Sequence, residues 1–247
     1  MVALAFVQAR MGSTRFPGKV LSPLDGRPSL LRIVDRLARV PALDGVAVLT
    51  SLAPGDDEIA ALCQREAMTC IRGDEDDVLG RFQLAAEQLK PDLVVRVTAD
   101  CPLIDPEVVA DLIDLHASRP ELAYAAVATG AIGAEAGFRR YPDGLDAEVF
   151  PAVLLEQASR AASDPYEREH VTPYIWRQPE RFPQAILECE RDLGTERWTV
   201  DHPADLELVR AVYERLSEPF GWREVVAMLD SDPTLRSLNA AHRVHQT

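Results

Sequence analysis

The chain has 247 residues, of which 47% are hydrophobic, so it can bury a substantial core, and its net charge at pH 7 is −14. That charge argues against a nucleic-acid-binding surface, because affinity for nucleic acid comes largely from basic groups that displace counterions. We therefore expect a single domain over residues 1–247 that binds no nucleic acid and no membrane, since no segment approaches the length of a membrane span.

The first hundred residues alternate between apolar runs and helical patterns. Four runs are typical of parallel strands covered on both faces: residues 4–7, 45–49, 68–71 and 93–97. Apolar residues at helical spacing lie between them, at residues 30–37, 59–62 and 78–89. This alternation predicts a Rossmann-like α/β fold with a mostly parallel central sheet.

The pattern changes after residue 100. A helix is expected at residues 106–116, with Asp105 as its N-cap and Pro106 at its first position. The later expected strands are residues 121–127, 144–150, 184–189 and 197–200, and the later expected helices are residues 151–162, 166–177, 203–216 and 221–229. The glycine-rich stretch 129–137 predicts a mobile or substrate-covering loop, and residues 138–177 interrupt the regular pattern as a possible acceptor-binding or dimerisation insertion.

The cysteines argue for a reducing compartment. Cys63, Cys70, Cys101 and Cys189 lie far apart and form no C-x-x-C pair, which predicts neither a zinc site nor a disulfide framework. The apolar run at residues 2–7 is too short for a signal peptide and follows no basic segment. We expect a cytoplasmic protein.

A basic loop follows the first expected strand. Arg10, Arg15 and Lys19 fall within ten residues, together with two glycines and the hydroxyl pair Ser13 and Thr14. Point charges, guanidinium forks and free backbone N–H groups are what a triphosphate requires at close range. The loop therefore predicts a polyphosphate-binding site.

Two familiar nucleotide motifs do not fit this loop. A Walker loop has four residues between its glycines and Ser or Thr after its lysine, whereas five residues separate Gly12 from Gly18 here and Val20 follows Lys19. The chain also lacks a G-x-G-x-x-G sequence, so a dinucleotide fingerprint is not expected.

Asp100 follows the expected strand at residues 93–97. Ligands of open parallel sheets bind beyond the carboxyl ends of the strands, so Asp100 should lie beside the basic loop. A carboxylate next to a polyphosphate usually needs a divalent cation to offset their repulsion, and Mg²⁺ is the common choice.

These residues resemble a known family. Residues 8–19 are similar to the opening signature of the cytidylyltransferases that activate sugar acids, which include the acylneuraminate and 3-deoxy-manno-octulosonate cytidylyltransferases, and in particular to their spore-coat polysaccharide biosynthesis branch. Further matching segments run in order over nearly the whole chain, at residues 72–79, 96–103, 141–149, 167–174 and 197–206. Phe16 and His202 stand where leucine and threonine are frequent, which bears on the acceptor more than on the reaction.

The resemblance implies a GT-A-like nucleotidyltransferase fold and a role for particular residues. Its implied nucleotide-binding residues are Gln8, Arg10, Gly12, Ser13, Arg15 and Lys19 around the phosphates and Gly73, Asp74 and Arg81 around the base. Its implied Mg²⁺ ligands are Asp100 and Asp201, and its implied acceptor-binding residues are Asp146, Glu148 and His170. Arg15, Lys19 and Asp100 would carry catalysis, and a homodimer is implied as well.

Structural roles compete with some of these functional ones. For Asp100 the alternative is the cap of a turn, and for Asp201, which precedes a helix, it is an N-terminal cap, with or without a metal-binding role. A structural role for His170 within its helix is as good an explanation as contact with an acceptor. Asp146 and Glu148 alternate along an expected strand and share a face, which lines the acceptor site or meets solvent.

The function that the resemblance implies is Mg²⁺-dependent transfer of CMP from CTP to a sugar or a nonulosonate-like sugar acid, with release of pyrophosphate, for cell-surface polysaccharide biosynthesis. One alternative is a sugar-1-phosphate nucleotidyltransferase that uses another NTP, because the same fold serves that reaction. A non-catalytic nucleotide-sugar binding protein is the other. The sequence leaves open which acceptor is used and whether a hydroxyl or a phosphate attacks.

Overall fold

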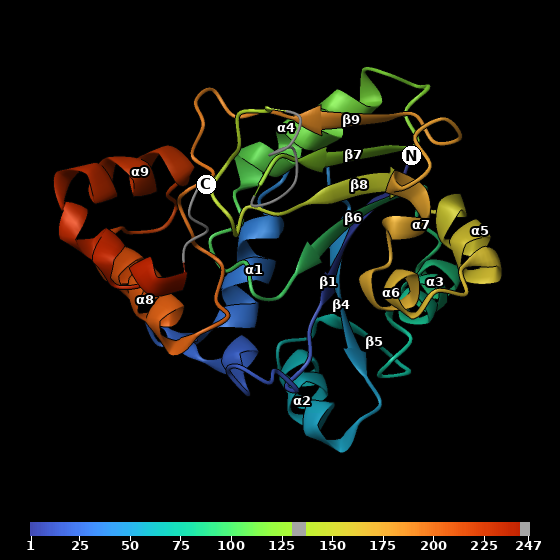
Figure 1. Ribbon diagram of the computed structural model, residues 1–247. Coiled ribbons are helices and arrows are strands. Elements are labelled where there is room, and N and C mark those ends of the chain that lie inside the picture. The colour runs from blue at the N-terminus through green and yellow to red at the C-terminus, as the bar shows by residue number, and fades with distance from the viewer. Residues whose placement is uncertain (130–136, 243–247) are drawn as a thin grey trace.

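The computed structural model describes residues 1–129 and 137–242, and its centre is a seven-stranded sheet (Figure 1). The strand order is β5-β4-β1-β6-β8-β7-β9. The strands are β1 (Ala3–Gln8), β4 (Gly45–Ser51), β5 (Thr69–Gly73), β6 (Leu93–Thr98), β7 (Tyr124–Val127), β8 (Glu148–Pro151) and β9 (Gln184–Leu187). All pairings are parallel except those of β8, which runs antiparallel to β6 and β7. The expected mixed α/β fold with a mostly parallel sheet is confirmed.

Helices cover both faces of this sheet (Figure 1). On one face lie α1 (Ser29–Leu37), α4 (Pro106–Ala117), α8 (Pro203–Arg215) and α9 (Trp222–Ser231). On the other lie α3 (Val78–Leu89), α5 (Val153–Ala161), α6 (Pro165–His170) and α7 (Pro173–Trp176), while α2 (Asp57–Arg65) packs near the β4–β5 edge. A hydrophobic core lies on each face of the sheet, and alternate residues of β6 pack into one or the other: Val94 is buried on the α3 side and Val95 on the opposite side. This double burial explains the continuous apolar runs of the parallel strands.

The shorter elements lie at the ends of these layers. They are the two-stranded pair β2 (Pro23–Leu24) and β3 (Arg27–Pro28), and the 3₁₀ turns η1 (Lys19–Leu21), η2 (Pro54–Asp56), η3 (Pro233–Ser237) and η4 (Ala240–His242). The predicted cap of α4 is confirmed, because the Asp105 carboxylate accepts from the backbone N–H of Glu107 at 2.8 Å and of Val108 at 3.3 Å.

The prediction of one helix over residues 166–177 is wrong, since α6 and α7 are separated at Val171. This buried residue has a φ of 70°, which a β-branched side chain rarely adopts. Its neighbour Thr172 donates its backbone N–H to the carbonyl of His170 at 2.8 Å and its hydroxyl to Glu148 at 2.7 Å. Pro173, at the first position of α7, was the local sign of this break, since a proline lacks the N–H that a continuous helix needs, and the tertiary contacts of Thr172 accompany it.

The prediction of a strand at residues 197–200 is also wrong. Their main chain meets a loop instead: the N–H groups of Trp198 and Thr199 both donate to the carbonyl of Asp143, and Val200 N–H donates to the carbonyl of Asp100. Only an isolated bridge joins Arg197 to Asp143. The strand expected at residues 144–150 begins at Glu148.

Most of the predicted glycine-rich loop, residues 130–136, lies outside the described residues. Within the described part of the chain, no helix has the length and apolar character needed to cross a membrane.

Candidate active site

The basic loop is folded back on itself at the carboxyl end of β1. The carbonyl of Met11 accepts from the N–H groups of Ser13 at 2.9 Å and Gly18 at 3.1 Å. Gly18 has a φ of 73°, a backbone conformation that favours glycine. The N–H of Met11 donates to the buried carboxylate of Asp56 at 2.7 Å, which ties the loop to η2. The hydrogen bonds thus fix the position of Lys19 at the start of η1.

Lys19 joins two aspartates from distant parts of the chain. Its Nζ lies 2.7 Å from Oδ1 of Asp201 and 3.2 Å from Oδ2 of Asp100. Asp100 follows the carboxyl end of β6, and Asp201 precedes α8. The Lys19 side chain is only 11% exposed, so solvent screens these ion pairs weakly. The structure therefore brings together the basic loop and both aspartates that the sequence singled out.

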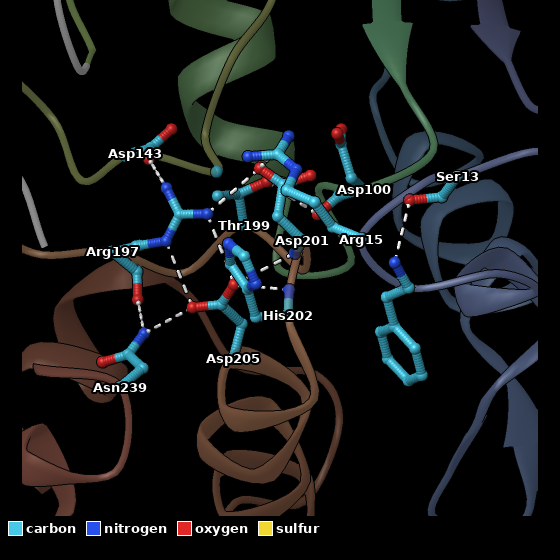
Figure 2. A network of polar contacts seen from close by, with 12 residues as sticks. Ser13, Arg15, Asp100, Asp143, Arg197, Thr199, Asp201, His202, Asp205 and Asn239 are labelled. Carbon is cyan, nitrogen blue, oxygen red and sulfur yellow. Dashed lines mark hydrogen bonds and ion pairs between the residues drawn. The ribbon is translucent and has the colours of Figure 1, made fainter. Parts of the chain in front are cut away.

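Cations surround the Asp201 carboxylate. Figure 2 shows Arg197 with its guanidinium between Asp143, Asp201 and Asp205, at N···O distances of 2.8, 3.0 and 3.1 Å. Arg15 Nη2 lies 3.2 Å from Oδ2 of Asp201. Burial alone would raise the pKa of Asp201, but the hydrogen bond and charge of Lys19, followed by those of Arg197, lower it below its usual value. Asp201 therefore stays ionised.

Asp205, and not Asp201, supplies the cap of α8. Its fully buried carboxylate accepts from the N–H groups of Asp201 at 3.0 Å and His202 at 2.9 Å. The amide of Asn239 donates to the same carboxylate at 3.1 Å (Figure 2). Because Asp205 satisfies the helix end, the side chain of Asp201 is free to face Lys19.

Two cavities meet at this cluster. The first, of about 390 Å³, contains the loop side chains Gln8, Arg10, Ser13, Arg15 and Lys19 and also Arg81, Glu169 and His170. The second, of about 240 Å³, contains Cys101, Asp143, Asp146, Glu148 and Thr199. Arg96, Thr98, Asp100 and Asp201 line both. We call the first the basic cavity, because five cations and three carboxylates line it. We call the second the acidic cavity, because five carboxylates line it and Arg96 is the one cation among its described residues.

Arg96 lies on the wall that the two cavities share. It is the cross-strand partner of Glu148 in the antiparallel β6–β8 ladder, and its Nη1 forms a very short ion pair with that carboxylate. Its Nε donates to Oε1 of Gln8 at 3.1 Å. Burial would lower the pKa of Arg96, but the charge of Glu148 outweighs it and raises the pKa above its usual value, so the guanidinium remains charged.

The carboxylates of the acidic cavity differ in how well the surrounding groups stabilise their charge. Glu148 is saturated with donors, since Tyr124 and Thr172 give it hydroxyl hydrogen bonds of 2.6 and 2.7 Å besides the pair with Arg96. Burial, and next the charge of Asp146, raise the pKa of Asp143 to about 7, although Arg197 opposes this. Burial also raises the pKa of Asp146.

Of the three residues expected around the nucleobase, Arg81 lines the basic cavity and Gly73 and Asp74 do not. Arg81 lines the basic cavity and is only 3% exposed, and its Nε has no hydrogen-bond partner within the described residues. Gly73 packs against it, since a Cβ there would lie 2.5 Å from Arg81 Cγ. Asp74 accepts from the N–H groups of Asp76 and Asp77 and, like Gly12, is not among the residues lining either cavity.

The three residues expected to face the acceptor divide between the cavities. Asp146 and Glu148 line the acidic cavity, so their shared face meets a cavity and not open solvent. His170, the last residue of α6, lines the basic cavity beside Glu169, and the centroid of its ring lies 4.2 Å from that of the Tyr166 ring.

Sequence reasoning gave no role to Arg96, Asp143 or Arg197. A charged residue within an otherwise apolar strand was the available signal for Arg96. Asp143 and Arg197 lie in segments that matched the family, but their pairing depends on the contact between two loops.

Comparisons with known proteins identify the same family. A family model described as cytidylyltransferase matches residues 4–232. The spore coat polysaccharide biosynthesis protein SpsF of Bacillus subtilis is 35% identical over 242 residues, covering 93% of this chain and 95% of the relative. A cytidylyltransferase structure from Leptospira borgpetersenii is 28% identical with a TM-score of 0.87 and full coverage of both chains. CMP:2-keto-3-deoxy-manno-octonic acid synthetase complexed with CTP shares the fold, at 20% identity, a TM-score of 0.64 and coverage of 87% of this chain and 99% of that one.

Proposed function

The chain belongs to the cytidylyltransferase family, whose members are nucleotidyltransferase enzymes, and we propose that it transfers CMP from CTP to a sugar or sugar acid with release of pyrophosphate. The observation that carries this proposal is the position of Lys19 between Asp100 and Asp201, where a basic and an acidic cavity meet. One cavity suits a polyphosphate and the other a hydroxyl-rich acceptor. The similarity to a spore coat polysaccharide protein supports a role in cell-surface polysaccharide biosynthesis.

The basic cavity is suited to the triphosphate of CTP. Arg10, Arg15 and Lys19 supply cations there, and the loop adds the hydroxyl of Ser13. Guanidinium groups bind phosphate in bidentate fashion, whereas a lysine acts as a point charge. We assign Arg15 and Lys19 to the pyrophosphate that leaves, because both already lie against Asp201 at the junction of the cavities.

A Mg²⁺ ion fits the donor set at this junction. Mg²⁺ is commonly held by one or two carboxylates together with substrate phosphates and waters. Asp100 and Asp201 are two such carboxylates, both within 3.2 Å of the same lysine nitrogen, and the described residues contain no cluster of three His, Cys, Asp or Glu side chains that would hold a metal without a substrate. When bound, the ion would reduce the charge on the α-phosphate and favour ionisation of the attacking group.

The protein's own part in the reaction is alignment and charge stabilisation. The acceptor oxygen attacks the α-phosphorus, the bond from that phosphorus to the bridging oxygen of the β-phosphate breaks, and pyrophosphate departs. Lys19 and Arg15 stabilise the charge that develops on the leaving group, while the acidic cavity orients the acceptor. A homodimer through residues 138–177 and a cytoplasmic location stay predictions.

The direct test is pyrophosphate release by the purified protein. The assay would pair each of CTP, UTP, ATP, GTP and dTTP with a panel of nonulosonates and sugar phosphates, in Mg²⁺ and in EDTA. The proposal expects release with CTP, a sugar or sugar acid and Mg²⁺, together with a CMP-linked product. Release with another NTP and a sugar phosphate would replace it with a sugar-1-phosphate nucleotidyltransferase. Calorimetric CTP binding without release from any acceptor would indicate a non-catalytic binding protein.

A further inference from the structure

We propose that Asn239 is a positioning residue for Asp201, because it fixes Arg197 and Asp205, the two residues that hold Asp201 in place. This inference rests on the proposed function, which assigns Asp201 to the Mg²⁺ ion and the nucleotide. It extends the site to residues 233–242, which we call the C-terminal segment and which contain η3 and η4. The segment lies outside residues 4–232, the part of the chain that the family model matches.

The C-terminal segment is anchored to the fold by its own contacts. Leu235 is buried in the hydrophobic core on the α8 and α9 side of the sheet, and the turn η3 packs against both helices. Arg236 donates from Nε to Oε1 of Glu196 at 2.6 Å and from Nη2 to Oδ1 of Asp230 at 2.7 Å. These contacts hold Asn239 against residues 196–205, the stretch that carries Asp201.

Asn239 joins two points of this stretch through one amide group. It is the only asparagine in the sequence, and it is fully buried. Figure 2 shows its Nδ2 donating to the backbone carbonyl of Arg197 at 2.9 Å and to Oδ1 of Asp205 at 3.1 Å. A side-chain amide carries two N–H donors on one nitrogen, whereas the hydroxyl of serine or threonine carries one donor. Asparagine can therefore bridge the two partners, which a serine or threonine could not do.

Both partners of Asn239 contact Asp201. Arg197 Nη2 lies 3.0 Å from Oδ2 of the Asp201 carboxylate, and Oδ2 of Asp205 accepts from the backbone N–H of Asp201 at 3.0 Å. The other carboxylate oxygen of Asp201, Oδ1, faces Lys19 at the junction of the cavities. Asn239 is thus connected to Asp201 by two routes, one ending at the carboxylate and the other at the backbone.

Loss of the Asn239 amide would redistribute these bonds. Within the described residues, Oδ1 of Asp205 accepts only from Asn239 and from Arg197 Nε. Without Asn239, this buried carboxylate depends more on Arg197, which also pairs with Asp143 and Asp201. The ion pair between Arg197 and Asp201 then weakens, because three carboxylates compete for one guanidinium. Residues that orient a metal-binding carboxylate in this way typically change metal affinity by about ten- to a hundredfold.

The test is calorimetric binding of CTP in Mg²⁺ and in EDTA. For each protein, the affinity in Mg²⁺ divided by the affinity in EDTA gives a Mg²⁺ ratio. Asn239→Leu keeps the approximate size of the side chain but removes both donors, and Asn239→Ser leaves one donor on a smaller side chain. Both are also made together with Asp201→Asn. Leu62→Ala is the control for stability alone, because this buried residue of α2 lines neither cavity, and thermal unfolding measures the stability of every variant.

The Mg²⁺ ratio should fall about tenfold in Asn239→Leu, while the affinity for CTP in EDTA stays within about threefold of wild type. Asn239→Ser should give an intermediate ratio. Together with Asp201→Asn, neither substitution should lower the ratio further, because the carboxylate through which Asn239 acts is already lost. Leu62→Ala should lower the melting temperature and keep the wild-type ratio.

A wild-type ratio in Asn239→Leu would overturn the role of Asn239 and leave the proposed function standing, since a merely structural residue lowers the melting temperature alone. If Asn239→Leu does not fold, a wild-type ratio in Asn239→Ser would do the same. An equal fall in the Asp201→Asn background, or in Leu62→Ala, would also overturn it. Absence of CTP binding and of pyrophosphate release in wild type would instead refute the proposed function, and this inference with it.

Discussion

Lys19 Nζ lies 2.7 Å from Oδ1 of Asp201, although 182 positions separate the two residues in the sequence. The same nitrogen contacts Asp100, so one lysine offsets the mutual repulsion of two carboxylates. A divalent cation and a nucleotide would change this balance of charge, because the cation would offset the carboxylates and the lysine would become available to phosphate.

Asp100→Asn should nearly abolish turnover while the fold survives. The substitution keeps the size of the side chain and its contact with the Thr98 hydroxyl, but it removes the charge at the junction of the cavities. Loss of one preorganised charge costs about 3 to 4 kcal/mol of barrier, or roughly two to three orders of magnitude in rate. Pyrophosphate release measures the rate, and circular dichroism during thermal unfolding checks the fold. Asp114→Asn, an exposed change on α4, should leave both unaltered, and unchanged turnover in Asp100→Asn would remove Asp100 from the mechanism.

Lys19→Met should destabilise the metal-free protein and sensitise it to Mg²⁺. The variant leaves Asp100 and Asp201 facing each other without their shared cation, at a cost of about 3 kcal/mol. Because a divalent cation then relieves the repulsion, MgCl₂ should raise the melting temperature of the variant more than that of wild type. Differential scanning calorimetry with and without MgCl₂ measures both effects.

Lys90→Met is the matched control, since Lys90 is exposed and is the other lysine of the chain. It should show the wild-type response to MgCl₂. The same response in Lys19→Met would mean that Lys19 does not balance the two carboxylates.

Gly144→Ala should unfold or severely destabilise the protein. Gly144 has a φ of 108°, and a Cβ there would lie 2.4 Å from the backbone nitrogen of Thr199. The loop that carries Asp143 and Asp146 would have to separate from residues 198–199, at a cost of more than about 3 kcal/mol. Urea unfolding measures the loss. Gly55→Ala, where a Cβ meets nothing within 4 Å, should stay within about 1 kcal/mol of wild type, and an equally small change at Gly144 would contradict the packing described.

Stability should fall as the pH rises from about 4 to about 7 because of Asp143. Burial raises its pKa from 3.8 to about 7 in the folded chain, so in this window the folded state keeps a proton that the unfolded state has lost. The unfolding free energy then decreases with rising pH, by on the order of 4 kcal/mol for about three units, and levels off above pH 7.

Urea unfolding of metal-free wild type and Asp143→Asn between pH 4 and 8 isolates this contribution. The comparison cancels groups common to both proteins, such as His116, whose pKa is lowered by burial and which acts in the opposite direction. The variant should show a weaker fall in stability over this range. Parallel curves for the two proteins would show that Asp143 is ionised throughout.

The parallel half of the sheet was predictable because its strands bury both faces. A largely apolar run such as that of β6 can be recognised without knowing which strands lie beside it. Because ligands bind beyond the carboxyl ends of parallel strands, Asp100 was then expected beside the basic loop, where the structure places it. The break at Val171 was also open to prediction, because Pro173 begins the next helix, whereas the hydroxyl bond from Thr172 to Glu148 beside it is a tertiary contact that no local pattern encodes.

The walls of the candidate site were less predictable than its centre. Arg96 becomes part of the site because β8 runs antiparallel and places Glu148 opposite it, and strand direction was not specified by the sequence pattern. Likewise, residues 197–200 alternate polar and apolar side chains as a strand does, with Trp198 and Val200 apolar, but the N–H groups of residues 198–200 bond to the carbonyls of Asp143 and Asp100 and form no ladder. Tertiary pairing, and not propensity, decided both.

The most direct test of the central claim is calorimetric binding of CTP to wild type and Asp201→Asn, each in Mg²⁺ and in EDTA. For each protein, the affinity for CTP in Mg²⁺ is divided by the affinity in EDTA. Dividing the wild-type ratio by the ratio for Asp201→Asn isolates the coupling between the cation and Asp201, because binding of Mg²⁺ to free CTP affects both ratios alike. The account predicts that Mg²⁺ strengthens CTP binding to wild type at least about tenfold more than binding to the variant. Equal strengthening in both proteins would contradict a nucleotide and metal site formed by Lys19, Asp100 and Asp201.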